Sequence, residues 1–117
     1  MYEYDAEITS VYDGDTCTAT IDLGFNLFTS KAKLRLVGIN TPEIRTKDPE
    51  EKVAGLAARD YLRSRIDGRK VRIQSLKKGK YGRYLAKIWV INEDGTLAED
   101  SVNNELLSVG LAKPYMA

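Results

Sequence analysis

The feature that most constrains the fold is a strict alternation of residue types in residues 16–22, TCTATID. Its cysteine, alanine and isoleucine alternate with three threonines, and successive side chains of a β-strand point to opposite faces. The period of two therefore predicts a strand with one apolar face and one polar face. Asp13-Gly14 comes before this strand as a turn signal, and residues 5–12 are predicted to form the strand before the turn.

Three further segments are predicted to form strands. Residues 31–39, 69–76 and 84–91 place apolar side chains at alternate positions. Residues 23–30 form a looser stretch that leads into the first of these three. Within 69–76 the valine and the isoleucine are expected to face inward. The chain is therefore predicted to contain five short strands.

A helix is predicted to begin at Pro49 and to end near Ile66. Asp48 can cap it, proline suits the first helical position, and Glu51 lies three residues after Asp48 as in a capping box. The side expected to face the core carries Ala54, Ala57, Ala58, Tyr61 and Leu62. A second, short helix is predicted within residues 101–110, with Ser101 as its N-cap.

This order of elements predicts the fold class. Five strands, with a helix between the third and the fourth and a short helix near the C-terminus, indicate an α+β protein built on a five-stranded OB-fold barrel. We expect one domain over residues 1–117, which is an ordinary domain length. Barrels of this kind bind oligonucleotides and oligosaccharides on a strand face and the adjoining loops.

Composition excludes several classes of protein and site. Hydrophobic residues make up 43% and charged residues 30%, as in a soluble globular protein. The absence of histidine excludes Ser–His–Asp and Cys–His sites, and a single cysteine excludes an internal disulfide. The N-terminal residues lack the apolar segment of a signal peptide, so we expect a cytoplasmic monomer. A secreted chain with its signal removed would look the same.

Charge is distributed unevenly along the chain. The net charge is +1, yet residues 68–91 contain no acidic residue. The basic residues of this segment are Arg69, Lys70, Arg72, Lys77, Lys78, Lys80, Arg83 and Lys87. Such a segment either attracts phosphate groups or is a solvated basic hairpin.

Polar residues near the predicted strand ends suggest a chemistry. Carboxylate, amide and carbonyl oxygens, such as those of Asp15, Asn40 and Thr41, suit Ca²⁺ or Mg²⁺ better than zinc. A hard cation, two arginines and one free carboxylate are what phosphodiester hydrolysis needs. Arg35 lies amid apolar residues, where a charge rarely lacks a partner. It is expected either to bind phosphate or to pair with a carboxylate such as that of Glu43.

Four segments together resemble the successive signatures of the staphylococcal nuclease (thermonuclease) family. They are VYDGDT (11–16), LRLVGINTPE (34–43), KYGRYLAKI (80–88) and LLSVGLAK (106–113), in the family's order and at compatible spacings. The resemblance implies an OB-fold barrel with helices. It also implies a Ca²⁺-dependent endonuclease that cleaves DNA and RNA with little sequence specificity.

The resemblance also implies roles for individual residues. Asp15 matches the metal-binding aspartate, and Thr41 matches the threonine whose backbone carbonyl reaches the metal. Glu43 matches the glutamate assigned as general base for the attacking water. Arg35 and Arg83 match the arginine pair that binds the phosphate.

Three more residues are expected to bind the nucleotide. Lys80 and Tyr81 match residues that line its phosphate site, and Tyr115 falls within about one position of a tyrosine that stacks on the base. The chain departs from the family at Gly79, where an acidic residue is usual, and at Asn40, where the family has aspartate.

The Asn40 departure bears directly on the metal site. Asparagine keeps a carbonyl oxygen but removes one negative charge, so we expect a working but weaker site for one Ca²⁺, with Mg²⁺ as the second choice. Nucleic acid is the expected partner, with no membrane. The alternative is a catalytically weak or inactive barrel that binds nucleic acid or a protein.

Overall fold

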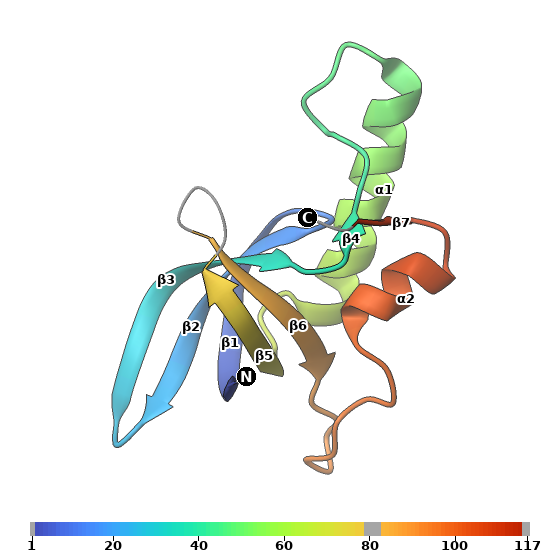
Figure 1. The fold of residues 1–117 in the computed structure, drawn as a ribbon. Helices are drawn as coiled ribbons and strands as arrows, with labels where there is room; N and C mark the ends of the chain where they lie inside the picture. Colours follow the sequence, from blue (N-terminus) through green and yellow to red (C-terminus); the bar gives the residue numbers. More distant parts are fainter. Residues whose placement is uncertain (1, 79–82, 116–117) are drawn as a thin grey trace.

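The computed structural model describes residues 2–78 and 83–115 and has a closed barrel at its centre (Figure 1). The elements are β1 (Tyr2–Asp13), β2 (Thr16–Gly24), β3 (Leu27–Leu36), β4 (Ile39–Asn40), α1 (Pro49–Ile66), β5 (Lys70–Lys78), β6 (Tyr84–Val90), α2 (Val102–Ser108) and β7 (Lys113–Pro114). No helix in the described residues is long and apolar enough to cross a membrane.

The barrel strands follow the order β1-β2-β3-β6-β5, and β5 closes the ring by pairing with β1. The β3–β6 pairing is parallel and the other pairings are antiparallel. Because α1 connects β4 to β5, it lies in the predicted place between the third and fourth barrel strands. The predicted five-stranded OB-fold barrel is confirmed.

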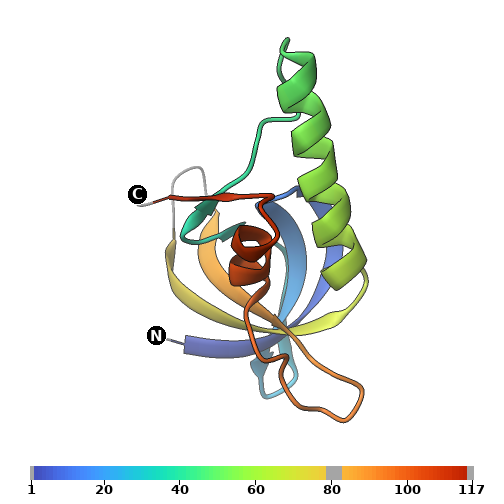
Figure 2. The same cartoon turned by 90° about the vertical axis from the view of Figure 1, so that its right-hand side faces the viewer.

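The core fills the barrel and continues under the two helices. Cys17, Ala19 and Ile21 of β2 are buried, as the alternation predicts, and so are the inward residues of β5. Burial raises the pKa of the Cys17 thiol to about 12, so this cysteine is a packing residue. Figure 2 shows α2 in front of the barrel and α1 along its side, and Leu62 and Leu106 from these helices join the core.

The β2–β3 hairpin is longer than the sequence predicts. Residues 23–30 lack a clear alternation, but β2 runs to Gly24 and β3 begins at Leu27. The turn lies at Phe25-Asn26, where both residues have positive φ, 54° and 60°. Two-residue turns with positive φ usually contain asparagine or glycine at both positions. Phenylalanine at the first position is unusual, so the sequence did not predict the turn.

The predicted strand 31–39 is divided into two elements. β3 ends at Leu36, and Gly38 turns the chain with a φ of 83°. Ile39 and Asn40 then leave the barrel and pair with Pro114 and Lys113 in a separate two-stranded sheet. No sequence pattern predicts this pairing, because both strands contain only two residues.

Helix α1 begins and ends as predicted, but the capping box is wrong. Asp48 is the N-cap, and its carboxylate accepts a hydrogen bond from the Glu50 N–H at 3.0 Å. Glu51 does not return to Asp48; its Oε2 accepts from Thr46 Oγ1 at 3.2 Å. The Asp48 N–H donates to the same Thr46 hydroxyl at 3.2 Å. Thr46 therefore accepts the hydrogen bond that a glutamate accepts in a capping box.

The buried stripe of α1 also differs from the prediction. Gly55, Ala58, Leu62 and Ile66 are buried, whereas Ala57 is exposed. The buried stripe is rotated because Gly55 of α1 packs against the backbone of Pro42 and Glu43. A helical pattern drawn from apolar side chains does not include glycine. The second helix spans Val102–Ser108, and its predicted N-cap is confirmed by a bond of 3.1 Å from the Asn104 N–H to Ser101 Oγ.

Candidate functional site

The site is centred on the buried carboxylate of Asp15, which follows the β1–β2 turn. Only 7% of this residue is exposed. The Thr41 N–H donates to its Oδ2 at 3.1 Å, and the Thr16 hydroxyl donates to its Oδ1 at 3.2 Å. A buried carboxylate is tolerated when both oxygens are satisfied in this way.

Arg35 projects from the outer face of β3 and links Asp15 to Asn40. Its Nη2 lies 3.4 Å from Asp15 Oδ2 and 3.4 Å from Asn40 Oδ1. Its Nη1 donates to the Leu36 carbonyl at 2.8 Å, which fixes the guanidinium plane. Among the described residues, the carboxylate that pairs with Arg35 is therefore that of Asp15 and not that of Glu43.

Strand register and a close approach bring these residues together. Thr16 is the cross-strand neighbour of Arg35, and the Leu36 N–H donates to the Asp15 carbonyl at 2.9 Å. Gly14 allows the turn to pack against the next segment. A Cβ at this position would lie 2.7 Å from Ala58 Cβ and 2.8 Å from Thr41 Cγ2. Glycine at position 14 is therefore needed for this packing.

The segment Thr41-Pro42-Glu43 is held against α1. Thr41 is buried, whereas Glu43 is exposed. A Cβ at Gly55 would lie 2.8 Å from the Pro42 carbonyl oxygen and 2.9 Å from that of Glu43. The helix backbone thus supports the turn from behind and leaves the Glu43 side chain toward solvent.

Asn103 is a positioning residue that the sequence analysis missed. It is 3% exposed, and its Nδ2 donates to the carbonyls of Val37 at 2.9 Å and Ala86 at 3.1 Å. Its Oδ1 accepts from the Ile88 N–H at 3.1 Å. The side chain therefore ties α2 to β6 and to the turn that leads to Asn40. The sequence feature that could have identified Asn103 is its position as a polar residue on the apolar side of a short helix.

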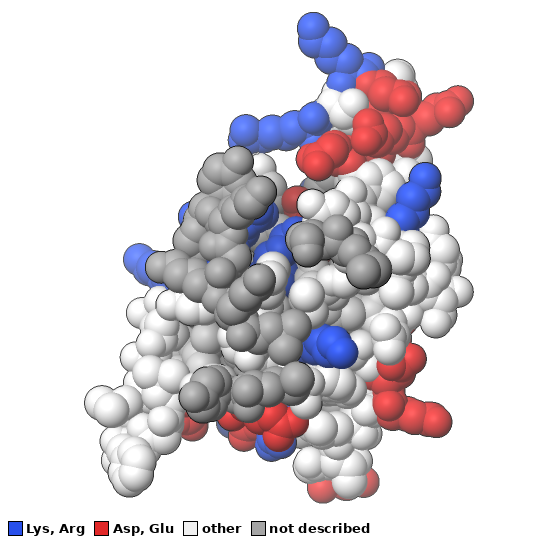
Figure 3. All heavy atoms as spheres, viewed as in Figure 1, with Lys and Arg blue, Asp and Glu red and all other residues white. Residues whose placement is uncertain are grey.

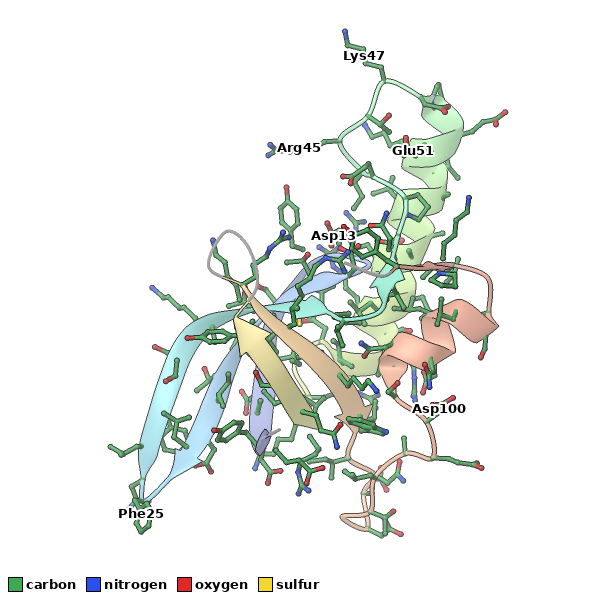
Figure 4. The ribbon with its side chains drawn as sticks, in the orientation of Figure 1. Asp13, Phe25, Arg45, Lys47, Glu51 and Asp100 are labelled. Carbon is green, nitrogen blue, oxygen red and sulfur yellow. The ribbon has the colours of Figure 1, made fainter. Side chains whose placement is uncertain are left out.

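Asp13 lies in the same corner, where Figure 4 labels it. Its Oδ1 accepts from the Asp15 N–H at 3.1 Å, which is the turn role expected of an Asp-Gly-Asp segment. Burial, followed by the neighbouring Asp15 carboxylate, raises the pKa of Asp13 from 3.8 to about 6. The sequence analysis assigned this residue no role in the site.

The remaining predicted residues are placed in part. Arg83 lines a pocket that Asp13 and Thr16 also line, so it faces the Asp15 corner. Tyr115 comes back to the site, because its N–H donates to the Gly38 carbonyl at 3.0 Å and its ring centroid lies 5.9 Å from Arg35 Cζ. Lys80 and Tyr81 lie outside the described residues.

The side-chain acceptors of this corner are oxygens, which is the kind of atom that hard cations bind. Asp15 Oδ2 and Asn40 Oδ1 both lie 3.4 Å from Arg35 Nη2, so the guanidinium brings the two oxygens to one side of the corner. All the donors are oxygens, as Ca²⁺ and Mg²⁺ require. No group of three histidine, cysteine or acidic side chains gathers around a possible metal position within residues 2–78 and 83–115. The donor set therefore carries a single carboxylate.

Comparison with known proteins agrees with this arrangement. The family model described as "Staphylococcal nuclease homologue" matches residues 33–117. A thermonuclease of Staphylococcus hyicus is 29% identical over 95% of the chain and 59% of its own length, and that of Staphylococcus intermedius is 29% identical over 91% and 56%. An uncharacterised protein of Methanocaldococcus jannaschii is 30% identical over 97% of the chain and 60% of its length.

The chain thus spans little more than half the length of these relatives. The family match covers most of the chain, from β3 to the C-terminus, and includes Arg35, Asn40 and Glu43. This chain belongs to the staphylococcal nuclease family.

Proposed function

We propose that the protein is a calcium-dependent endonuclease that hydrolyses phosphodiester bonds of DNA and RNA with little sequence specificity. One observation carries the proposal. The oxygens of Asp15 and Asn40 converge beside Arg35, while the exposed carboxylate of Glu43 follows on a segment braced by α1. The residues that we assign to the metal, to the phosphate and to the general base therefore follow one another closely along the chain.

Asp15, Asn40 and the Thr41 carbonyl are the residues that would hold the calcium ion. When bound, the ion would polarise a phosphoryl oxygen and help to lower the pKa of water. Asparagine supplies an oxygen without charge, so this set would hold the ion more weakly than a set with two carboxylates. Thr41 is suited to the task because its N–H already bonds Asp15, which fixes the peptide beside it.

The two arginines would stabilise the charge that develops on the phosphoryl oxygens. Arg35 Nη1 is held by the Leu36 carbonyl, so the guanidinium would keep its orientation while Nη2 donates to a phosphate that lies beside Asp15. Arg83 would bind the same phosphate from the side of the neighbouring pocket. Charge stabilisation of this kind is commonly worth several kcal/mol in the transition state.

Glu43 would take a proton from the attacking water or orient it. The water oxygen forms the new bond to phosphorus, and the bond from phosphorus to the 5′-oxygen breaks. The products, by analogy with the family, are a 3′-phosphate and a 5′-hydroxyl. Because Glu43 is exposed, its substitution has little reason to disturb the fold.

The alternative function is a module that binds nucleic acid or a protein without cleaving. Asn40 is the observation that favours it, since the site has one carboxylate fewer than the family pattern. The intact set of Asp15, Glu43, Arg35 and Arg83 favours catalysis, because binding alone does not need a base.

Two single variants test the proposal on a supercoiled plasmid in calcium. Glu43→Gln and Arg83→Ala should each lower the cleavage rate by at least about a hundredfold. Glu50→Gln on the first turn of α1 and Arg69→Ala before β5 are matched controls and should cleave like the parent protein. Circular dichroism checks that every variant is folded. Cleavage by Glu43→Gln or Arg83→Ala at the parent rate would refute the assigned roles.

A further inference from the structure

A shallow pocket of about 380 Å³ lies beside the site, on the outer face of the first three strands. Three of its residues, Asp13, Thr16 and Arg83, belong to the corner already described. The other three, Tyr12, Thr18 and Lys33, have no part in the proposed hydrolysis. The pocket therefore extends the site along the barrel surface, away from Glu43 and Tyr115.

The strand register aligns this extension with the phosphate-binding arginine. Thr16 faces Arg35 across β2 and β3, and Thr18 faces Lys33 two residues further along. Residues two apart in a strand share a face, so Lys33 and Arg35 stand side by side on the outside of β3, about 7 Å apart along the strand. Successive phosphates of an extended single strand have a comparable separation. The two cations are thus spaced for neighbouring phosphates.

An exposed aromatic residue forms the far rim of the pocket. Tyr12 lies on β1, next to the buried Val11, and 60% of it is exposed. The threonines of β2 lie between Tyr12 on one side and Lys33 on the other. An aromatic ring and a cation across a floor of hydroxyl groups match a base, a phosphate and the sugar between them.

We infer that this pocket binds the nucleotide next to the one whose phosphate is hydrolysed, with Lys33 on its phosphate and Tyr12 stacked on its base. The inference rests on the proposed function and deepens it. A base can stack on Tyr12 only when it is unpaired, so the favoured substrate is single-stranded DNA or RNA of at least two nucleotides. Asp13 also lines the pocket, and its Oδ1 accepts from the Asp15 N–H.

The first test is binding without cleavage. Fluorescence anisotropy in EDTA measures the affinity of the protein for a labelled thymidine hexanucleotide over a range of salt concentrations. Lys33→Gln should weaken binding and reduce the slope of log affinity against log salt by about 0.7, the value for one phosphate contact on a single strand. Tyr12→Leu should weaken binding by about fivefold or more and leave the slope unchanged.

Two matched controls lie on the same hairpin but outside the pocket. Lys31→Gln removes an exposed charge from β3, and Phe28→Leu removes an exposed aromatic ring. Both should bind the hexanucleotide as the parent protein does. If Lys33→Gln and Tyr12→Leu behave like these controls, the pocket is not a nucleotide site and the inference is wrong.

A second test separates this inference from the proposed function. The kcat/KM in calcium is measured for the hexanucleotide and for a nitrophenyl phosphodiester of a single nucleotide. The pocket variants should lower the ratio of the two values by at least fivefold, and an unchanged ratio would overturn the inference while leaving the nuclease in place. A parent protein that cleaves neither substrate would refute the nuclease, whereas the anisotropy result would still decide whether the pocket binds a single strand.

Discussion

The two ends of the β2–β3 hairpin differ in opposite ways from the usual pattern of buried apolar and exposed charged residues. At the barrel end, Asp15 is a charged residue that is 7% exposed. At the tip, Phe25 is 96% exposed, and Leu27 and Phe28 are each 61% exposed. Figure 4 labels Phe25 at the end of the hairpin, and Figure 3 shows that the tip is uncharged on the face in view.

The two exceptions differ in what they demand of the rest of the chain. A buried carboxylate needs hydrogen-bond partners, and Asp15 finds them on Thr16, Arg35 and Thr41, from three separate segments. The exposed apolar side chains of the tip need no hydrogen-bond partner, and they pack against little of the rest of the protein. We conclude that the barrel end is rigid because its polar groups fix one another, and that the tip contributes little to stability.

The largest difference is expected for aspartates at the two ends. Asp15→Ala should lower the free energy of unfolding by about 3 kcal/mol, because the Thr41 N–H loses its acceptor and the largely buried Arg35 loses its carboxylate partner. Asp22 also accepts a backbone hydrogen bond, from the Gly24 N–H at 2.8 Å, but in an exposed position. Asp22→Ala should cost less than about 1 kcal/mol. Urea unfolding in EDTA measures both, and equal losses would contradict the comparison.

Calcium affinity should separate the two ends by about one order of magnitude. Asn40→Asp adds a second carboxylate beside Asp15 and should tighten calcium binding roughly tenfold, as measured by titration calorimetry. Asn26→Asp adds the same charge at the tip and should leave the affinity unchanged. If Asn40→Asp gives no gain, the oxygen of residue 40 is not a metal ligand.

The pH dependence of stability should report the burial of the Asp13 carboxyl group and its closeness to Asp15 at the barrel end. The pKa of Asp13 is raised to about 6 in the fold from 3.8, so the folded protein favours its protonated form and stability from this group falls as pH rises through this range. Asp13→Asn keeps the acceptor for Asp15 without the charge. It should be about 1 kcal/mol more stable than the parent at pH 8, after allowance for solvent screening, and no more stable at pH 3. A gain independent of pH would contradict this assignment.

The smallest effect is expected at the tip itself. Phe25 has a φ of 54°, which asparagine adopts more readily, and its exposed ring has no packing to lose. Phe25→Asn should raise the free energy of unfolding by about 0.5 kcal/mol and leave cleavage unchanged. Thermal unfolding and plasmid digestion measure the two quantities. A loss of stability above about 1 kcal/mol would show that the tip is not an independent region.

The sequence predicted best where each residue obeys a simple rule. The alternation in β2 placed Cys17 and Ile21 in the core, and Asp48-Pro49 marked the start of α1. It failed where a distant contact decides the outcome. The β4–β7 pairing depends on Lys113 and Pro114 reaching Asn40, and no local pattern encodes it.

The candidate site was likewise predicted in part. Motifs identified Asp15, Arg35 and Asn40, which the structure brings together, but could not show that Arg35 pairs with Asp15. That pairing depends on strand register and on the turn at Gly38. The roles of all the predicted site residues, including Lys80 and Tyr81, remain predictions.

We propose that calcium held at the barrel end makes this protein cleave nucleic acid. Digestion of single-stranded DNA and of RNA, with calcium and then with excess chelator, tests it most directly. We expect cleavage of both substrates in calcium, products that end in a 3′-phosphate, and loss of cleavage with the chelator. Binding without cleavage in calcium, or cleavage that the chelator does not affect, would contradict it.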